Sequence, residues 1–543
     1  MKQFLMTRLS DVIWLMFIVM FTFSFSRHRI NFEAHPFEDA AMLMRYSEHL
    51  AQGYGIVWNI GETPVEGATD FLFMIVVAFL NKIGLTIETA VRSITILSHY
   101  LTIILIYCGM RLLQKADRFS SGLSATYFAV GPGLALSAAY FGTPFFALGI
   151  CCSWLLAQRL ILREKNISTI IVFSLICLLT GLTRPEGVII SCFMVLAIGV
   201  LVPARSFFKT CFIFGTIFAI LGGAYFLWRW NYFGYVLPNP MYKKAGGHFY
   251  LTSLIGSVKN SMRLIWPIFP AFALALRSRS SMRQVVAFSI PIVGSVIMWC
   301  LLSSEMNFGY RFQYPVFVIG IMSWFPLVKT LSADLRLFKW GELDCLQKMA
   351  ITTLIIGGSW YVVFVRMKDT GSITYSQRDG RYTIACVLSQ YKNNNYLLAT
   401  TEAGLLPFYS KWKAIDTWGL NDQWIAHHGP ITSSYLEKRM PDVLMFHAFF
   451  SPSTEHSPNV QLPIYLRGVA TQWIRRWNSQ ILTIKNFAEQ HKYLLAAAFC
   501  FSSSDAHYYY VRRDNPDCMA IVQRIRDVDY RSEAGEVGKK FVN

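Results

Sequence analysis

The sequence carries little charge for its length. Charged residues make up 15% of the 543 residues, whereas soluble proteins carry about 25%. Hydrophobic residues reach 54%, so the composition excludes an ordinary soluble protein and predicts an integral membrane protein. No internal repeat and no low-complexity segment is evident, which excludes a repeat architecture.

The cysteines lack the spacing of a metal site. No C-x-x-C motif occurs among the 11 cysteines. Most of them lie in apolar runs, where they are expected to pack as small apolar residues. Cys386, Cys500 and Cys518 lie in the polar C-terminal third. One disulfide is possible there if that part faces an oxidising compartment.

Positive charge is the one abundant charge, and its position excludes nucleic acid as the expected partner. The net charge is +18, but the basic residues gather in short connectors between apolar runs: Arg111, Lys115 and Arg118; Arg159, Arg163 and Lys165; Arg277, Arg279 and Arg283; Lys329, Arg336 and Lys339. This pattern is typical of the cytoplasmic loops of membrane proteins. The expected partner of these residues is therefore the lipid bilayer.

Apolar runs lie near residues 11–26, 70–83, 90–112, 122–139, 144–162, 167–182, 187–202, 207–228, 263–276, 284–302, 312–328 and 349–366. No small-residue cleavage site follows the first run, so we expect a retained anchor with its N-terminus inside. The basic connectors then place the loop 27–69 and the C-terminal part outside, which requires an odd number of spans. We predict about 11 spans, with one of the runs between 70 and 162 not crossing the membrane.

After residue 366 the sequence is polar and reads as an α/β domain. Strand patterns occur at Tyr396–Thr400, Val443–Phe446, Tyr493–Phe501 and Tyr508–Val511, and helical patterns at Ser434–Arg439 and Asn486–His491. The sequence thus predicts a polytopic α-helical membrane domain over residues 1–366, with a large first outer loop at 27–69, and an extracytoplasmic α/β domain over residues 367–543.

The stretch from Phe37 to Asp70 is the most unusual loop. A long polar loop after a first span costs chain entropy and needs a reason. It opens with Glu38 and Asp39 and continues as a predicted helix through about Gln52, whose apolar face suggests that it lies on the membrane interface. Asp39 is either a first-turn or capping acid or a catalytic base. Glu38 is expected to be a solvated or supporting acid.

The other outer loops carry further charges. In Thr183–Gly187, Arg184 either pairs with Glu186 or faces a lipid phosphate, a task that suits the planar arginine fork. The loop after Trp228 supplies Arg229 and Lys243 as possible phosphate contacts. The loop 303–313 holds Glu305 and Arg311, where Glu305 either assists Asp39 or forms a salt bridge with Arg311.

Because these loops share one side, they offer carboxylates and arginines at one lipid–water boundary. A carboxylate can take a proton from an acceptor hydroxyl, and cationic side chains stabilise a departing phosphate as its charge develops. A phosphate leaving group needs no acid, so one base suffices for a single displacement that inverts the sugar, whereas hydrolases need two carboxylates.

The order of motifs resembles the GT-C glycosyltransferases, polytopic enzymes that use polyprenyl-phosphate sugars, and within them the terminal arabinofuranosyltransferase family of the mycobacterial cell envelope and its bacterial relatives. The similarity runs along most of the chain. It rests on Glu38-Asp39-Ala40, Arg45-Tyr46, Gly53–Asn59, Val65–Thr69, Thr183–Gly187, Tyr232–Gly234, Leu237–Asn239, Arg311-Phe312, Glu402–Gly404 and Asp416–Asp422.

The resemblance implies that Asp39 is the catalytic base, with Glu38 beside it, and that the outer domain helps to hold a glycan acceptor. It also implies a set of residues that bind the donor phosphate or substrate: Arg45, Glu66, Arg184, Glu186, Arg229, Asn239, Lys243, Glu305 and Arg311. A divalent cation could bridge Asp39 or Glu305 to the phosphate, although no ligand cluster demands one.

Three positions depart from the family pattern. Glu38 stands where the family has a first aspartate, Gly142 stands where relatives often carry an acid, and Glu305 stands where they often carry aspartate. These changes leave the fold as expected but put the sugar in doubt.

We therefore expect a membrane glycosyltransferase of the bacterial cytoplasmic membrane that moves a sugar from a polyprenyl-phosphate donor to an envelope glycan or glycolipid. Two alternatives stay open: a lipid or glycan transporter or flippase, and a non-catalytic envelope-assembly protein. A transporter would favour ionisable residues in mid-membrane and repeat-related halves, neither of which the sequence displays.

Overall fold

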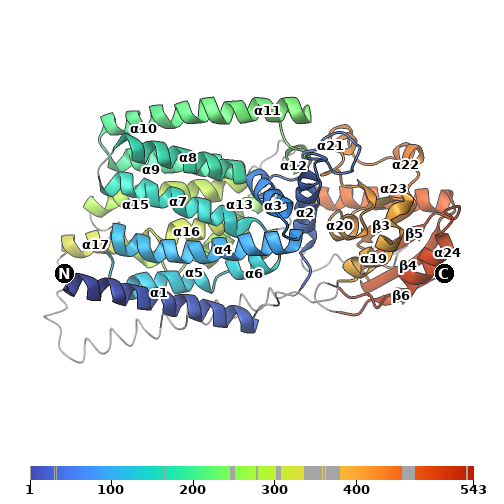
Figure 1. Ribbon diagram of the computed structural model, residues 1–543, viewed down its shortest axis with the longest axis horizontal. Coiled ribbons are helices and arrows are strands. Elements are labelled where there is room, and N and C mark those ends of the chain that lie inside the picture. Colours follow the sequence, from blue (N-terminus) through green and yellow to red (C-terminus); the bar gives the residue numbers. More distant parts are fainter. Residues whose placement is uncertain are drawn as a thin grey trace.

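The protein consists of a helical bundle with a sheet domain at one end of it (Figure 1). The computed structural model describes residues 2–29, 31, 34–163, 166–244, 251–276, 279–300, 307–335, 358, 361, 379–454, 471–532 and 536–542. The predicted boundary between residues 366 and 367 and the last apolar run, 349–366, lie largely outside these ranges.

The bundle contains most of the predicted apolar runs as helices. They are α1 (Lys2–Arg29), α3 (Phe71–Lys82), α4 (Ile87–Cys108), α5 (Arg118–Ala129), α6 (Gly133–Ala138), α7 (Thr143–Leu162), α8 (Ile167–Thr183), α9 (Glu186–Leu201), α10 (Ala204–Ile217), α11 (Gly223–Phe233), α13 (Leu251–Ile265), α14 (Phe269–Ala275), α15 (Arg279–Ile297), α16 (Tyr314–Ile321) and α17 (Trp324–Leu335).

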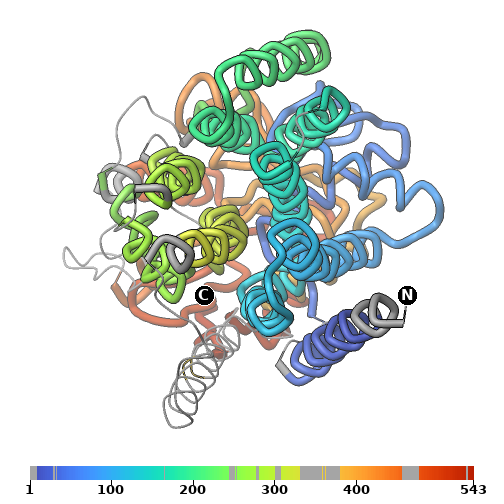
Figure 2. The backbone as a smooth tube through the Cα atoms, turned by 90° about the vertical axis from the view of Figure 1, so that its left-hand side faces the viewer, coloured from blue at the N-terminus to red at the C-terminus, as the bar shows by residue number. Residues whose placement is uncertain are grey.

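Among the described residues, five helical stretches are long and apolar enough to cross a membrane: Leu9–His28, Ile87–Leu113, Thr143–Leu162, Ala204–Phe233 and Phe308–Thr330. Shorter apolar helices accompany them. α1 and the α10–α11 stretch lie at the edge of the bundle (Figure 2) and expose large apolar side chains such as Met20, Phe212 and Leu227, which suits contact with lipid tails. The predicted membrane protein is thus confirmed, and the number of spans stays a prediction.

The predicted run 122–139 is broken into α5 and α6 at Gly131-Pro132. Proline has no backbone N–H to donate and blocks the preceding helical turn. α3 has only 12 residues, about 18 Å at 1.5 Å per residue, and so is shorter than the hydrocarbon core of a bilayer. Two of the runs between residues 70 and 162, in which the sequence predicts one that does not cross the membrane, are thus a short helix (α3) and a broken helix (α5 and α6).

The described parts of the basic connectors lie at the end of the bundle that is far from the sheet domain (Figure 1). There, Asp11 of α1 accepts hydrogen bonds from Arg111 at 2.9 Å and from Arg118 at 3.1 Å. The first outer loop and the sheet domain share the opposite end. This arrangement agrees with the sidedness that the charge pattern predicts.

The helix α2 (Glu38–Ala51) begins at the predicted acids and lies between the bundle and the sheet domain (Figure 1). The sequence suggested that the apolar face of this helix lies on the membrane interface. In the structure, that face is buried within the protein instead. Tyr46 is fully buried, and its hydroxyl donates to Asn421 Oδ1 of the sheet domain at 3.0 Å. The apolar face that suggested a membrane contact is thus covered by the protein's own second domain.

The sheet domain has a mixed six-stranded sheet in the order β2-β1-β3-β5-β4-β6. β1 pairs in parallel with β2 and β3, and the remaining pairs are antiparallel. The strands are β1 (Leu397–Thr400), β2 (Lys413–Asp416), β3 (Val443–Ala448), β4 (Leu494–Ser502), β5 (Asp505–Val511) and β6 (Lys539–Phe541). The helices around them are α19 (Gly380–Leu388), α20 (Leu405–Ser410), α21 (Gln423–His428), α22 (Ser433–Arg439), α23 (Thr471–Gln490) and α24 (Cys518–Arg526).

The predicted α/β domain is confirmed, together with the strands that became β1, β3, β4 and β5. The sequence missed β2 and β6, which have only four and three residues and are too short for a clear alternation. Cys386, Cys500 and Cys518 are all free thiols, so they do not form the disulfide that the sequence left possible.

Candidate active site

Asp39 and Arg311 form an ion pair where the bundle meets the sheet domain. Arg311 Nη2 donates to Asp39 Oδ2 at 2.6 Å. Asp39 lies in the first turn of α2, as predicted, and makes no capping hydrogen bond as an N-cap, because Phe37 holds that position. Its side chain is 26% exposed, whereas that of Arg311 is 9% exposed. The carboxylate is thus the more accessible member of the pair.

A second ionic group lies at the same end of the bundle. Arg184 donates to Glu186 Oε1 at 3.0 Å and lies 3.4 Å from Asp70 Oδ1. Asp70 precedes the first turn of α3 and Glu186 begins α9, so both acids lie where a helix N-terminus favours negative charge. The sequence left open whether Arg184 pairs with Glu186, and the structure contains that pair.

The segment Phe141-Gly142 connects the two ionic groups. The guanidinium of Arg311 stacks over the Phe141 ring, 4.6 Å from its centroid. A Cβ atom at Gly142 would lie 2.9 Å from Asp70 Oδ2. The carboxylate of Asp70 therefore takes up the space beside Gly142, the position at which relatives were expected to carry an acid.

The backbone is strained on both sides of this cluster. Tyr140, directly before Phe141, has φ of 65°, and Tyr310, directly before Arg311, has φ of 59°. Left-handed conformations of non-glycine residues cost of order 1–3 kcal/mol and gather at functional sites. Here they set the positions of the ring and the guanidinium that surround Asp39.

Glu38 points away from Asp39, into the sheet domain. Its Oε1 accepts hydrogen bonds from the backbone N–H of Gly404 and of Leu405, at the start of α20. Burial raises the pKa of Glu38 to about 8, and the nearby positive charge of Arg381 opposes that rise. Glu38 is therefore buried rather than solvated. Its contacts fit the supporting role that the sequence offered, by fixing α2 to α20.

Arg45 lies inside the interface between the first outer loop and the sheet domain. Its guanidinium donates to the carbonyl oxygens of Trp58 at 2.8 Å, Trp412 at 2.8 Å and Pro407, and to Asn59 Oδ1 at 3.1 Å. Because these contacts occupy its N–H groups, the guanidinium of Arg45 is not available to bind the phosphate of a sugar donor. Arg45 therefore joins the first outer loop to the sheet domain, and the predicted contact with the donor phosphate is not supported.

Asn59 and Trp58 continue this interface along the edge of the sheet. Asn59 both donates to and accepts from the backbone of Ala414, at 3.0 and 2.9 Å, and Trp58 Nε1 donates to Ala414 O at 2.9 Å. Ala414 belongs to the edge strand β2. The first outer loop thus covers an edge that would otherwise expose unpaired backbone groups.

Glu66 and Arg229 bind each other rather than an open site. Arg229 Nε donates to Glu66 Oε1 at 2.7 Å and Nη2 to Oε2 at 2.5 Å. Asn239 is buried beside them, and its side-chain amide donates to Leu420 O at 3.2 Å. These contacts tie the loop after α11 to the first outer loop and to the sheet domain.

Lys243, at the end of α12 (Asn239–Lys244), faces the sheet domain, with Nζ 5.1 Å from the Trp418 ring centroid. Burial lowers the pKa of Lys243, while the charge of Asp416 opposes that shift. Glu305 lies outside the described residues. Of the predicted set, the structure therefore brings together Asp39, Arg184, Glu186 and Arg311.

Sequence reasoning missed Asp70. The residue closes the loop that was singled out and stands directly before an apolar run. An acid at a membrane boundary needs a partner, and this signal would have paired Asp70 with the arginine of another outer loop.

The fold and the cluster define the class of protein. The bundle with its long first outer loop, the outer sheet domain and the charged cluster between them form the GT-C fold, and three solved structures show it over nearly the whole chain. ArnT from Cupriavidus metallidurans in the apo state matches with a TM-score of 0.52 and 13% identity, over 92% of this chain and 98% of that one.

The same protein bound to undecaprenyl phosphate matches with a TM-score of 0.52 and 12% identity, over the same shares of both chains. The archaeal oligosaccharyltransferase AglB from Archaeoglobus fulgidus, in complex with an inhibitory peptide and a dolichol-phosphate, matches with a TM-score of 0.51 and 12% identity, over 93% of this chain and 75% of that one. At such identity the likeness shows the fold alone.

Residues 371–519 also match a family described as a domain of unknown function, DUF8728. The described residues of that segment, 379–454 and 471–519, lie in the sheet domain. No curated protein matches the chain. The predicted GT-C fold is thus confirmed, and the narrower resemblance to terminal arabinofuranosyltransferases stays a prediction.

Proposed function

We propose that the protein is a membrane glycosyltransferase that moves a sugar from a polyprenyl-phosphate donor to an envelope glycan or glycolipid. The observation that carries this proposal is the Asp39–Arg311 pair of 2.6 Å at the junction of bundle and sheet domain. It joins an accessible carboxylate to a buried cation, next to a second arginine in Arg184. Two solved proteins of this fold hold lipid phosphates, undecaprenyl phosphate in ArnT and dolichol-phosphate in AglB.

In the proposed reaction, Asp39 takes the proton of an acceptor hydroxyl as its oxygen attacks the anomeric carbon of the donor. The bond from that carbon to the phosphate oxygen breaks, and the lipid phosphate keeps the electron pair. A single displacement of this kind inverts the anomeric centre. It needs one base and no acid, which agrees with Glu38 being turned away into the sheet domain.

Arg311 and Arg184 supply the positive charge that the departing phosphate needs. Within the described residues, Arg311 Nε is buried and has no hydrogen-bond partner. An arginine fork with an unused donor suits a phosphate oxygen. As the phosphate binds Arg311, the carboxylate of Asp39 is released from part of its ion pair and can accept a hydrogen bond from the acceptor hydroxyl. The pair thus links donor binding to activation of the acceptor.

A divalent cation at this cluster would compete with the two arginines for the carboxylates. Asp39 and Asp70 offer carboxylate oxygens, the ligands that Mg²⁺ and Mn²⁺ prefer. When bound, such an ion would supply further positive charge to the phosphate. The two arginines already place positive charge at both carboxylates.

The same arrangement supports a proposal for the location of the site. The described parts of the basic connectors lie at one end of the bundle, and α2 and the sheet domain lie at the other (Figure 1). We therefore place the site on the outer face of the bacterial cytoplasmic membrane, with the sheet domain extracytoplasmic. A transporter or flippase has less support, because the charged cluster lies at the end of the bundle rather than in mid-membrane.

The test uses purified full-length protein in nanodiscs with a panel of radiolabelled polyprenyl-phosphate sugars and an envelope glycan extract. We expect wild type and a control variant, Asp514→Asn, to transfer one sugar, and Asp39→Asn to transfer none. Asp514 is an exposed acid of the sheet domain that pairs with Arg512. An active Asp39→Asn enzyme would exclude Asp39 as the base. Folded wild type that turns over no donor would favour the transporter or the non-catalytic assembly protein.

A further inference from the structure

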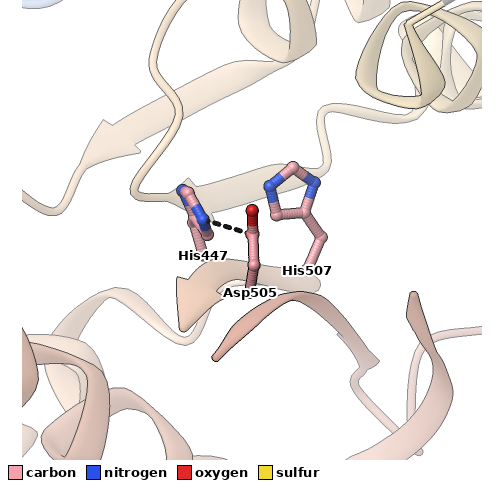
Figure 3. Close-up of side chains that lie close together, drawn as sticks. All are labelled: His447, Asp505 and His507. Atoms are coloured by element: carbon pink, nitrogen blue, oxygen red, sulfur yellow. Dashed lines mark hydrogen bonds and ion pairs between the residues drawn. The ribbon is translucent and has the colours of Figure 1, made fainter. Parts of the chain in front are cut away.

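Three possible metal ligands converge on one face of the sheet: His447, Asp505 and His507 (Figure 3). His447 of β3 lies directly opposite His507 of β5 in the antiparallel register. Asp505 is two residues before His507 on the same strand, so its side chain points to the same face. One ligand atom from each residue lies within 4.8 Å of the others.

Each histidine has one ring nitrogen held by an outer partner. His507 Nδ1 lies 2.7 Å from the Tyr530 hydroxyl, which lies 2.9 Å from the Tyr509 hydroxyl. His447 Nδ1 lies 3.3 Å from Glu402 Oε1. Metal-binding histidines usually donate their second N–H to a carboxylate, carbonyl or other oxygen, which fixes the ring and its tautomer. The Nε2 atoms of both rings are then left for an ion.

The Nε2 atoms face the carboxylate. His447 Nε2 lies 2.8 Å from Asp505 Oδ1, and a ring nitrogen of His507 is turned toward the same carboxylate (Figure 3). Ligands at about 2.0–2.2 Å from a zinc ion stand roughly 3 Å apart. The His447–Asp505 distance is close to that, and all three ligand atoms lie within 4.8 Å of one another, so side-chain movements would admit an ion.

The donor set selects the kind of ion. Two imidazoles and one carboxylate suit Zn²⁺ and similar transition metals, whereas Mg²⁺ and Ca²⁺ prefer oxygen ligands alone. The side chains of His447 and Asp505 are partly exposed, at 17% and 24%. A fourth position is thereby open to water or to an oxygen of a ligand, as in zinc sites with three protein ligands.

We propose that His447, Asp505 and His507 form a binding site for a divalent transition-metal ion of the Zn²⁺ type in the sheet domain. The site is separate from Asp39 and does not depend on the proposed transferase activity. The alternative is a metal-free cluster in which a protonated His447 bridges Asp505 and Glu402. The two arrangements differ in whether the protein takes up an ion at this position.

An ion at this site would be connected to the candidate active site through charged side chains. Glu402 Oε2 accepts a hydrogen bond from Arg381 Nη1 at 2.9 Å, and the same nitrogen lies 3.7 Å from Glu38 Oε2. Glu38 in turn holds α20 and is the neighbour of Asp39. The ion would therefore stabilise the end of the sheet domain that fixes α2.

The experiment uses full-length protein in detergent, freed of metal with a chelator. Titration with Co²⁺ is followed by its visible absorption, and titration with Zn²⁺ by calorimetry. We expect one ion per chain in wild type and in the control His428→Gln, which changes an exposed histidine of α21. Asp505→Asn and His507→Gln should abolish this binding. Glu402→Gln, which keeps all three ligands, should weaken it about 10–100-fold, as outer partners do.

Folding is monitored by thermal unfolding of each metal-free variant. If Asp505→Asn does not fold, the two single variants Glu402→Gln and His507→Gln still test the proposal. Folded wild type that takes up no ion would overturn the proposal in favour of the metal-free cluster. Binding that survives in both Asp505→Asn and His507→Gln but is lost in Asp39→Asn would also overturn it, because the ion would then lie in the membrane-facing site.

Discussion

The buried ion pair of Arg229 and Glu66 allows a test of whether Arg229 stabilises the fold or binds the donor phosphate. The two side chains are only 7% and 12% exposed, and they make two parallel hydrogen bonds of 2.7 and 2.5 Å. Arg229 Nη1 also donates to Val236 O at 2.8 Å. The change Arg229→Met removes the charge and leaves the carboxyl of Glu66 buried without its partner.

Removing one member of a buried pair typically costs about 3–5 kcal/mol, because the other charge stays uncompensated. Burial already raises the pKa of Glu66, with Arg229 opposing that rise. Without Arg229 the carboxyl is expected to take up a proton, which lowers the loss toward the smaller end of that range. The double variant Arg229→Met with Glu66→Gln removes both charges, and it should regain most of the stability.

The assay is thermal unfolding in one detergent, followed by tryptophan fluorescence, with the KM for the lipid donor measured on the same samples. We expect Arg229→Met to lower the unfolding midpoint by several degrees and the double variant to restore it. An unchanged midpoint together with a raised KM would refute this reasoning. Arg229 would then contact the donor phosphate, as the sequence alone predicted.

Three further predictions concern the first outer loop. Glu38→Gln should keep its hydrogen bonds with the α20 amides and remain active. Glu38→Ala should lower the free energy of unfolding by about 1–3 kcal/mol, measured by thermal unfolding. An inactive Glu38→Gln would indicate that Glu38 is catalytic. Burial lowers the pKa of His49 to about 4 from 6.5. The contribution of His49 to the free energy of unfolding is therefore full above pH 6.5 and is lost as the pH falls toward 4. His49→Gln should flatten the curve of unfolding midpoint against pH in that range, and an unaltered slope would contradict the prediction. A Cβ on Gly67 would lie 2.0 Å from Asn421 Oδ1, so Gly67→Ala should cost about 1–3 kcal/mol and increase protease cleavage at the domain junction, while Gly215→Ala, which meets open space, should not.

Local patterns in the sequence predicted the local structure well. The helix of the first outer loop begins at Glu38 and ends at Ala51, within a residue of the predicted end, because its first-turn acids, its apolar face and the glycine that follows it at residue 53 are local features of the sequence. Four strands of the sheet were found for the same reason. The very short strands β2 and β6 were missed, since three or four residues carry no clear period.

The partners of the charged side chains were harder to predict. Arg45, Arg184 and Arg229 all lie in segments that the sequence assigns to outer loops. Composition cannot distinguish an arginine that binds a carbonyl or a carboxylate from one that binds a phosphate. That distinction depends on contacts between residues far apart in the chain, such as Arg45 with Pro407. The same is true of Asp70, whose importance appears only beside Gly142.

The covered edge of β2 has a consequence for engineering this fold. Because Trp58 and Asn59 hydrogen-bond to Ala414, the outer domain is assembled jointly by two distant stretches of the gene. A chimera that exchanges residues 379–542 alone would pair a foreign edge strand with the wrong loop. A working hybrid must inherit residues 34–70 together with the outer domain, so these two stretches form one unit of exchange, although some three hundred residues separate them.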